Sequence, residues 1–425
     1  MQEAVSLRLL LLAYYYPPLG GPAVQRPCKL VKYLRQYGSK VDVITIRDTL
    51  YHSKDETLLT ECVPDRLFRT ASFDPLYLLN KIYSLLPFSK KDIYGSASTS
   101  TKNKVKSFFP IDDKIGWVPF AVKAGKKALL TNKYDAVMVT CSPFSAILAA
   151  QRIARFGKLP LVLDYRDHWT LNNFVFQHQG RSFQRLQKLE QKCLREAALV
   201  LTSTSAMKDD LTANFGSELK AKILPFYNGY DEADFIDLKR QRQSDGKIRI
   251  TYLGTLYGER SLTSFLQAFQ QVQNAYPERD LEFWLVGNFP PEIHAEIEQS
   301  GIANKVVFIP QQPHKQALQL MLDTDILLLV IGDEKTNWSL PGKLFEYLRC
   351  RRPILALTDK NSEAAKILLS CGHKTICPQN DVDAIGSCLE ELTENIPVDE
   401  NLYQIPYEYE RGRQVRMLCE RLSEL

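Results

Sequence analysis

Nearly continuous runs of Val, Ile and Leu alternate with helical patterns along the chain, and the whole alternation occurs twice. In the first half these runs are "LRLLLLAYYY" (7–16), "KVDVITI" (40–46), "YDAVMVTC" (134–141), "LPLVLDYRD" (159–167) and "ALVLTST" (198–204). In the second half they are "IRITYLGT" (248–255), "LEFWLVG" (281–287), "KVVFIP" (305–310), "DILLLVI" (325–331) and "RPILALT" (352–358). Strands that are apolar on both faces are typical of parallel sheets covered by helices. The pattern predicts an α/β protein with two doubly wound, Rossmann-like domains.

The turns and polar stretches between these runs set the expected domain bounds. We expect a first domain over 1–228, a linker over 229–246, a second domain over 247–400 and a terminal segment with an amphipathic helix over 401–425. Residues 48–114 do not fit the alternation, so they are either an insertion that contacts substrate or a surface excursion. Ligands of such sheets bind beyond the carboxyl ends of the strands, and two domains facing each other would enclose a central cleft.

The composition, with 45% hydrophobic and 24% charged residues among 425, is that of a soluble globular protein. The apolar opening is too short to span a bilayer and has no cleavage site of small residues, which argues against a signal peptide. Nine scattered cysteines suit a reducing cytosol better than a disulfide framework. We therefore expect a cytoplasmic protein.

Charge is divided unevenly along the chain. Residues 1–230 contain 33 Lys and Arg against 19 Asp and Glu, whereas residues 231–425 contain 21 against 30. The basic residues gather over 102–117 and 123–127. This surface could attract the inner face of an anionic membrane or a phosphorylated substrate, or be a solvated basic face.

In each half, a glycine-containing loop follows the first strand. In "YPPLGGPAVQR", Gly20 and Gly21 allow backbone N–H groups to approach an anion, and Arg26 can add charge. The third glycine of the dinucleotide fingerprint is absent, which argues against a nicotinamide-dependent dehydrogenase. In "YLGTLYGERSL", a strand ends at Gly254 and Arg260 precedes a helix, a suitable place for a diphosphate.

The stretch "LPGKLFEYLRCRRPIL" (340–355) predicts a helix that begins near Gly342. Lys343 offers a positive charge for a phosphate, and Glu346 lies on the same face, where its carboxylate can accept hydrogen bonds from a ribose diol. Leu344 turns inward, and we group it with the donor-binding residues of this helix. The alternative is a surface Lys–Glu pair worth about 0.2–0.5 kcal/mol.

These motifs occur in the order of a known family. "YYYPPLGG", "VLDYRDHW", "LTSTSAMKDDL", "LPFYNGYDEADF", "ITYLGTLYGERSL", "EFWLVGN" and "GKLFEYLRCRRPIL" together resemble the retaining GT-B-fold glycosyltransferases of the family-4 group, which build bacterial polysaccharides and glycolipids. The resemblance implies an acceptor-binding first domain and a second domain that binds a UDP- or GDP-linked sugar. It also implies that the terminal helix crosses back toward the first domain.

The resemblance assigns further roles to individual residues. Glu346 matches the glutamate that holds the donor ribose, and Arg260 matches a residue that neutralises the diphosphate. Gly20 and Gly21 match the loop that approaches the donor phosphates. Gly287 and the loop with Gln311 match positions that meet sugar, ribose and base. The chain departs from many relatives at Trp338, where a sugar-binding glutamate is common, and at Thr255, where an arginine is common, so Lys343 is expected to replace the missing charge.

The acceptor side of the predicted site is the strand end "DYRDHWT", where Asp167 or His168 could orient or deprotonate an acceptor hydroxyl. Asp164 and Arg166 could instead form a structural pair that braces this loop. No metal site is expected, and the only substrates implied are the nucleotide sugar and a lipid-linked or saccharide acceptor, with no nucleic acid.

The sequence therefore favours a hexosyltransferase that needs no metal, and two alternative functions stay open. A nucleotide-sugar epimerase shares this fold, and "DYRDHW" does not exclude it. A non-catalytic assembly partner is the other, because Thr255 and Trp338 depart from the common pattern.

Overall fold

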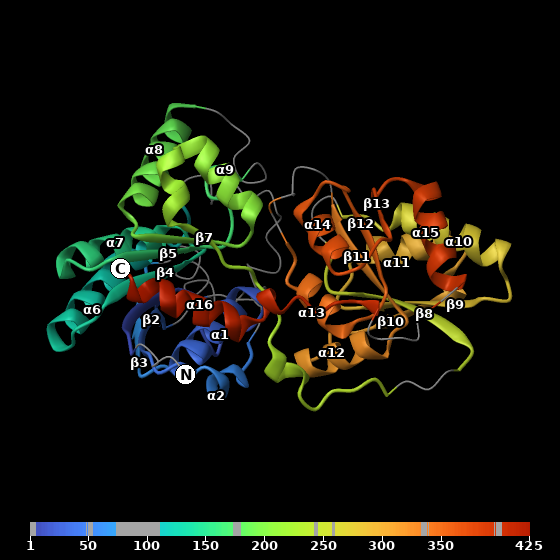
Figure 1. Ribbon diagram of the computed structural model, residues 1–425, viewed down its shortest axis with the longest axis horizontal. Helices are drawn as coiled ribbons and strands as arrows, with labels where there is room; N and C mark the ends of the chain where they lie inside the picture. The colour runs from blue at the N-terminus through green and yellow to red at the C-terminus, as the bar shows by residue number, and fades with distance from the viewer. Residues whose placement is uncertain are drawn as a thin grey trace, which may run out of the picture. The chain divides into compact units, whose positions relative to one another are not determined.

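A computed structural model describes residues 6–47, 49, 54–73, 111–172, 180–241, 245–256, 260–332, 338, 340–394, 396 and 402–425. It divides into two units, residues 1–227 with 412–425 and residues 228–411. Figure 1 shows that each unit is built around its own sheet, with helices on both sides of it.

The first unit contains a seven-stranded sheet in its described part, in the order β3-β2-β1-β4-β5-β6-β7, and all its pairings are parallel. The strands are β1 (Arg8–Ala13), β2 (Lys40–Ile46), β3 (Arg66–Thr70), β4 (Ala136–Cys141), β5 (Leu161–Tyr165), β6 (Leu199–Thr202) and β7 (Ile223–Pro225). The helices are α1 (Pro22–Gln36), α2 (Leu58–Glu61), α6 (Val118–Thr131), α7 (Ser145–Gly157), α8 (Arg181–Glu196), α9 (Ser205–Phe215) and α16 (Arg411–Ser423).

The second unit repeats this plan with a six-stranded sheet in its described part, in the order β10-β9-β8-β11-β12-β13. The strands are β8 (Lys247–Leu253), β9 (Asp280–Val286), β10 (Val306–Ile309), β11 (Ile326–Gly332), β12 (Ile354–Thr358) and β13 (Ile376–Cys377). The helices are α10 (Thr263–Ala275), α11 (Pro291–Gln299), α12 (His314–Asp323), α13 (Lys343–Cys350), α14 (Glu363–Ser370) and α15 (Val382–Glu394).

The two sheets confirm the predicted α/β class with two doubly wound domains. The strand order reverses between β1 and β4 and again between β8 and β11, the position where such sheets bind ligands. The central strands are apolar because both faces are covered; every residue of β4, β5 and β11 is buried.

The last helix, α16, joins the core of the first unit although it follows the second unit in sequence. Its Val415, Leu418, Cys419 and Leu422 belong to the same apolar cluster as the strands of that unit. The Tyr227 N–H also donates to Gln414 Oε1 at 2.7 Å.

Part of the proposed insertion can be placed. Within 48–114 the structure describes 49, 54–73 and 111–114, and these residues include α2 and β3, which extends the first sheet at its edge. The remainder, 48, 50–53 and 74–110, lies outside the described residues. None of the described helices has the length and apolar character needed to cross a membrane.

Candidate active site

Two glycines bring the ends of neighbouring strands together in the second unit. Gly254 follows β8 with φ of 117°, and Gly287 follows β9 with φ of 148°. A Cβ atom on Gly287 would lie 2.4 Å from the Gly254 carbonyl oxygen. Only glycine fits both this close approach and the positive φ, so the two strand ends can lie this close together only with glycine at position 287.

Lys343 lies directly beside this glycine pair. It begins α13, whose Leu344, Phe345, Tyr347 and Leu348 are buried and fix the helix in the core. The Lys343 ammonium donates to the Leu253 carbonyl oxygen at 2.9 Å and lies 3.7 Å from the centre of the Tyr252 ring. Burial lowers the pKa of Lys343 well below its usual value and the Arg260 charge lowers it further, whereas Glu346 acts in the opposite direction.

Arg260 supplies a second cation near Lys343. Its Nε donates to the carbonyl oxygen of Ile331, in β11, at 3.1 Å. The Arg260 charge is one cause of the lowered pKa of Lys343, and an anion placed between two such cations would offset their repulsion. Arg260 and Lys343, predicted from separate motifs, are therefore close enough to interact.

Glu346 lies one turn into α13 and contacts a residue that the sequence analysis did not select. Its Oε1 lies 2.9 Å from His314 Nε2, and 17% of its side chain is exposed. Gln311, after β10, is exposed, and its Oε1 accepts from Asn288 Nδ2 at 3.0 Å, next to Gly287. Leu344 is fully buried, so its side chain anchors α13 and is removed from any ligand.

The corresponding loop of the first unit contains Gly20 and Gly21 ahead of α1. Gly21 has φ of 81°, and its carbonyl oxygen accepts from Val24 N–H at 3.0 Å. Arg26 lies one turn further on, but it is buried and binds Asp164 at the end of β5 through Nε at 3.0 Å and Nη2 at 2.6 Å. It also donates to the Phe226 carbonyl oxygen at 2.8 Å. Much of its charge is thus satisfied inside the unit.

The pairing within "DYRDHW" differs from the structural pair considered in the sequence analysis. Asp164 binds Arg26, while Arg166 Nη1 donates to the Ala23 carbonyl oxygen at 2.8 Å. Both arginines therefore connect the end of β5 to α1, because the strand end and the helix start lie on the same edge of the sheet.

The two acceptor-side candidates lie in different surroundings. Asp167 is exposed, whereas His168 is 1% exposed and its Nε2 lies 2.9 Å from Asp210 Oδ2 in α9. Of the pair, Asp167 is the one that a substrate could reach.

A buried glutamate fixes the ends of this loop. Glu190, in α8, accepts from the Tyr165 hydroxyl through one oxygen and from the Thr170 backbone N–H, at 2.9 Å, through the other. Burial raises the pKa of Glu190, and its hydrogen bonds from Thr170 and Tyr165 act in the opposite direction. Glu190 thereby sets the shape of residues 165–170.

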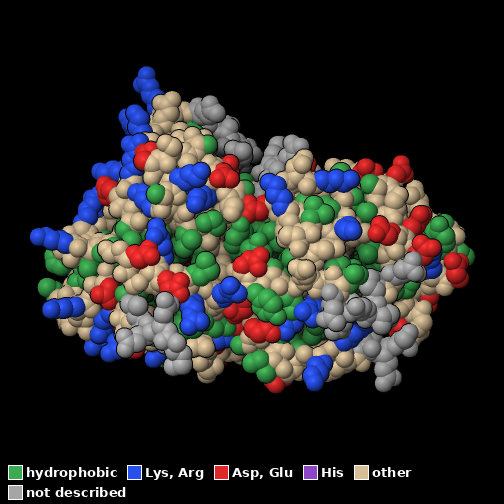
Figure 2. Space-filling view, viewed as in Figure 1, with side chains coloured by type: hydrophobic (Ala, Val, Ile, Leu, Met, Phe, Trp, Pro, Cys, Tyr) green, Lys and Arg blue, Asp and Glu red, His purple; other side chains and the backbone are tan. Residues whose placement is uncertain are grey.

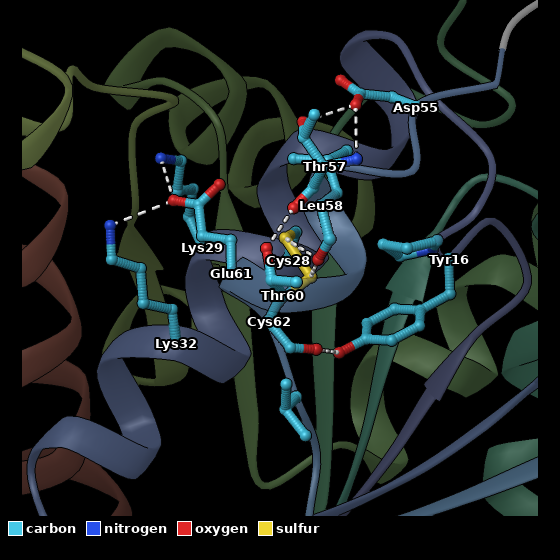
Figure 3. Close-up of a disulfide and its surroundings, with 12 residues drawn as sticks. Tyr16, Cys28, Lys29, Lys32, Asp55, Thr57, Leu58, Thr60, Glu61 and Cys62 are labelled. Carbon is cyan, nitrogen blue, oxygen red and sulfur yellow. Dashed lines mark hydrogen bonds and ion pairs between the residues drawn. A yellow bond between two sulfur atoms is a disulfide. The ribbon is translucent and has the colours of Figure 1, made fainter.

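One disulfide corrects the expectation that the cysteines are free thiols. Cys28 of α1 is bonded to Cys62, just after α2, and Figure 3 shows Glu61 beside them, reached by Lys29 and Lys32. The other seven cysteines, all in described parts of the chain, are free. The sequence did not predict this bond because 34 positions separate its partners, which meet only when α2 packs on α1.

Two family models match the chain. The model described as Glycosyltransferase Family 4 matches residues 23–234, and the model described as Glycosyl transferases group 1 matches residues 247–395. The chain belongs to the GT-B glycosyltransferases. The expected transferase activity on a nucleotide sugar is thus supported independently of the motifs. No curated protein matches this glycosyltransferase.

Solved structures share the fold over its whole length. Anabaena Alr3699/HepE, in complex with UDP and glucose, has a TM-score of 0.64 at 17% identity, covering 99% of this chain and 100% of that one. The apo form of the lipopolysaccharide outer core galactosyltransferase WaaB has a TM-score of 0.61 at 12% sequence identity. The match covers 99% of this chain and 100% of that one. UDP-GlcNAc 2-epimerase from Neisseria meningitidis, bound to UDP-GlcNAc, has a TM-score of 0.59 at 14% sequence identity. This match also covers 99% of this chain and 100% of that one. Because transferases and epimerases share this fold, the fold does not separate them, and the two family models favour the transferase.

Several residues that contact the candidate groups within each unit were not found from the sequence. They are Tyr252, Asn288, His314 and Tyr347 in the second unit and Glu190 and Asp210 in the first. Tyr347 accepts the Leu253 N–H at 3.1 Å through its hydroxyl, which fixes α13 to the end of β8. Tyr347 could have been found from the sequence, because it lies four residues after Lys343 and therefore on the same helix face.

Proposed function

We propose that this glycosyltransferase moves a hexose or amino sugar, with retention, from a UDP- or GDP-linked donor to a lipid-linked or saccharide acceptor in cell-surface polysaccharide or glycolipid synthesis. The observation that supports this most is the convergence of Lys343, Arg260 and Glu346 beside the Gly254–Gly287 pair. These groups suit two parts of a nucleoside diphosphate: two cations for the phosphates and a carboxylate for the ribose diol.

In the proposed reaction, the main task of this site is to stabilise the leaving group. As the bond from sugar to phosphate weakens, negative charge grows on the departing diphosphate and positive charge grows on the sugar. Lys343 and Arg260 are held in place beforehand by the carbonyl oxygens of Leu253 and Ile331, so little reorganisation is needed when the charge develops. We propose that these cations carry out the stabilisation without a metal ion.

Asp167 is our proposed acceptor-side group. It is exposed, while Glu190 and Arg26 hold the neighbouring residues Tyr165 and Asp164. An ionised carboxylate in this place can accept the proton of an attacking hydroxyl or orient it. His168, buried against Asp210, is better suited to support the loop.

A basic surface on the first unit supports the proposal that this unit contacts an anionic membrane. Figure 2 shows Lys and Arg side chains gathered at the left, over α6, α7 and α8. In α8, Arg181, Arg185, Lys188 and Lys192 are all exposed and follow a spacing of four, three and four, which places them on one helix face. Each basic residue near an acidic membrane contributes about 1 kcal/mol.

The deciding experiment is calorimetric titration with UDP, GDP and ADP, followed by transfer assays with the corresponding sugar donors and a membrane extract. We expect one nucleotide to bind, and Arg260→Ala, Lys343→Ala and Glu346→Gln each to weaken it at least about tenfold. Lys247→Ala is the matched control, because Lys247 lies at the opposite end of β8 and pairs with Glu282. Failure of every nucleotide to bind would support a non-catalytic partner.

The same assay separates the transferase from an epimerase. An epimerase would change the stereochemistry of the donor without any acceptor, whereas the proposed enzyme needs an acceptor to consume it beyond slow hydrolysis. Inversion of donor stereochemistry in acceptor-free reactions, followed by NMR, would overturn the transferase proposal.

A further inference from the structure

His314 lies between two carboxylates that come from different parts of the second unit. It is the first residue of α12, directly after Pro313. Its Nε2 lies 2.9 Å from Glu346 Oε1 in α13, and its Nδ1 lies 3.9 Å from Asp234 Oδ2 in the 3-10 turn Glu232–Phe235. The imidazole is thus close to the residue proposed to hold the donor ribose.

The surroundings favour the charged imidazole. Burial opposes the charge, but the hydrogen bond and charge of Glu346, together with Asp234, outweigh it and raise the pKa of His314, while Arg411 acts against them. Lys315 and Asp237 line the same pocket and bind each other at 3.4 Å. His314 is 39% exposed, so it exchanges protons with solvent readily.

This contact limits what the Glu346 carboxylate can do. A glutamate has three side-chain torsions, and a partner on one oxygen removes much of their freedom. A carboxylate offers about four acceptor sites, so an imidazole on Oε1 leaves capacity for a vicinal diol. An ionised carboxylate only accepts hydrogen bonds, which suits the two donor hydroxyls of a diol.

We propose that His314 is a positioning residue that orients Glu346 toward the donor ribose and so makes the enzyme select ribonucleotides over 2′-deoxyribonucleotides. This rests on the proposed function, in which Glu346 binds the diol. A 2′-deoxy ligand lacks one of the hydroxyls that the Glu346 carboxylate would bind. This loss lowers the affinity only if the carboxylate is held in place, because a mobile carboxylate can turn to another partner.

The experiment compares dissociation constants of UDP, GDP and ADP with those of their 2′-deoxy forms, by calorimetry. For the tightest nucleotide, we expect wild type to prefer the ribose form at least about tenfold. His314→Phe should weaken the ribose form about tenfold, leave the deoxy form nearly unchanged and bring the ratio close to one. His314→Gln, which keeps a neutral donor, should retain part of the preference. His294→Phe is the matched control, because His294 stacks on Phe308 at 4.0 Å in the same unit.

The pH dependence of this ratio gives a second readout that general destabilisation does not change. The wild-type ratio should fall as pH rises through the raised pKa of His314, because the neutral ring holds Glu346 less firmly. Titration of Lys343 affects ribose and deoxy forms alike and cancels in the ratio. His314→Gln should show no such step.

The possible failures are distinguishable. Binding of no nucleotide overturns the proposed function and this inference together. A preference that survives Glu346→Gln overturns the ribose role of Glu346. A preference that is lost in Glu346→Gln but unchanged in His314→Phe overturns the inference about His314 alone.

Discussion

The Lys343 ammonium donates to the Leu253 carbonyl oxygen at 2.9 Å, and this contact joins the start of α13 to the last residue of β8. The ammonium also lies over the Tyr252 ring, so a carbonyl dipole and an aromatic face, both uncharged, hold it in place. No full negative charge in this contact competes with an incoming phosphate. The lysine is thereby positioned for an anion before that anion arrives.

Nucleotide binding is predicted to take up protons through Lys343. Burial and the nearby Arg260 charge lower its pKa in the free protein, and a bound diphosphate restores the ammonium form. Affinity should therefore fall as pH rises through the lowered pKa. Calorimetry in buffers of different ionisation enthalpy measures the proton uptake directly. Lys343→Met should bind at least about tenfold more weakly and show no such uptake; equal uptake in both proteins would contradict the assignment.

The Arg26–Asp164 pair is predicted to matter more for stability than any exposed pair. Its side chains are 5% and 0% exposed, so Asp164→Asn leaves a buried guanidinium without its counter-charge. We expect a loss of about 3–5 kcal/mol in the free energy of unfolding of the first unit, measured by urea denaturation. Glu218→Gln is the control: its pair with Arg195 is 55% exposed on both sides, and we expect a change below about 1 kcal/mol. Similar losses in both variants would refute the difference.

The sheets and the start of α13 were predictable because their determinants are local in sequence. A strand covered on both faces must be apolar throughout, as β11 is, and the Pro-Gly break at 341–342 immediately precedes α13. Gly254, Gly287, Lys343 and Glu346 each follow such a local pattern.

The contacts that were not predicted join elements that are distant in sequence. His314 looks like an ordinary first residue of α12 until α13 brings Glu346 to 2.9 Å. Arg26 looks free to bind a phosphate until β5 places Asp164 beside it, 138 positions away. Periodicity shows which face of an element is buried, but not which polar groups meet there.

Reduction of the Cys28–Cys62 bond is predicted to destabilise the first unit. The bond closes a segment with a sequence separation of 34, which corresponds to about 2–4 kcal/mol. A reducing agent should lower the urea midpoint of the wild type but not of Cys28→Ala/Cys62→Ala, and thiol labelling in denaturant should detect seven groups before reduction and nine after. Cys193→Ala, at a buried free thiol, is the control and should still respond to the reducing agent. Nine thiols before reduction would rule the bond out.

Gly287→Ala is predicted to damage the donor site and the fold together. The added Cβ would lie 2.4 Å from the Gly254 carbonyl oxygen, at a φ of 148° that is unfavourable for alanine, so the ends of β8 and β9 must separate. This displaces the Leu253 carbonyl that holds Lys343. We expect a loss of about 1–3 kcal/mol in stability and at least tenfold weaker nucleotide binding.

Gly386→Ala, inside α15 with open space around its Cβ, should instead stabilise the protein by up to about 1 kcal/mol and leave nucleotide affinity unchanged. Thermal unfolding and calorimetric titration of both variants make the comparison, and normal nucleotide binding by Gly287→Ala would show that the two strand ends need not lie so close together.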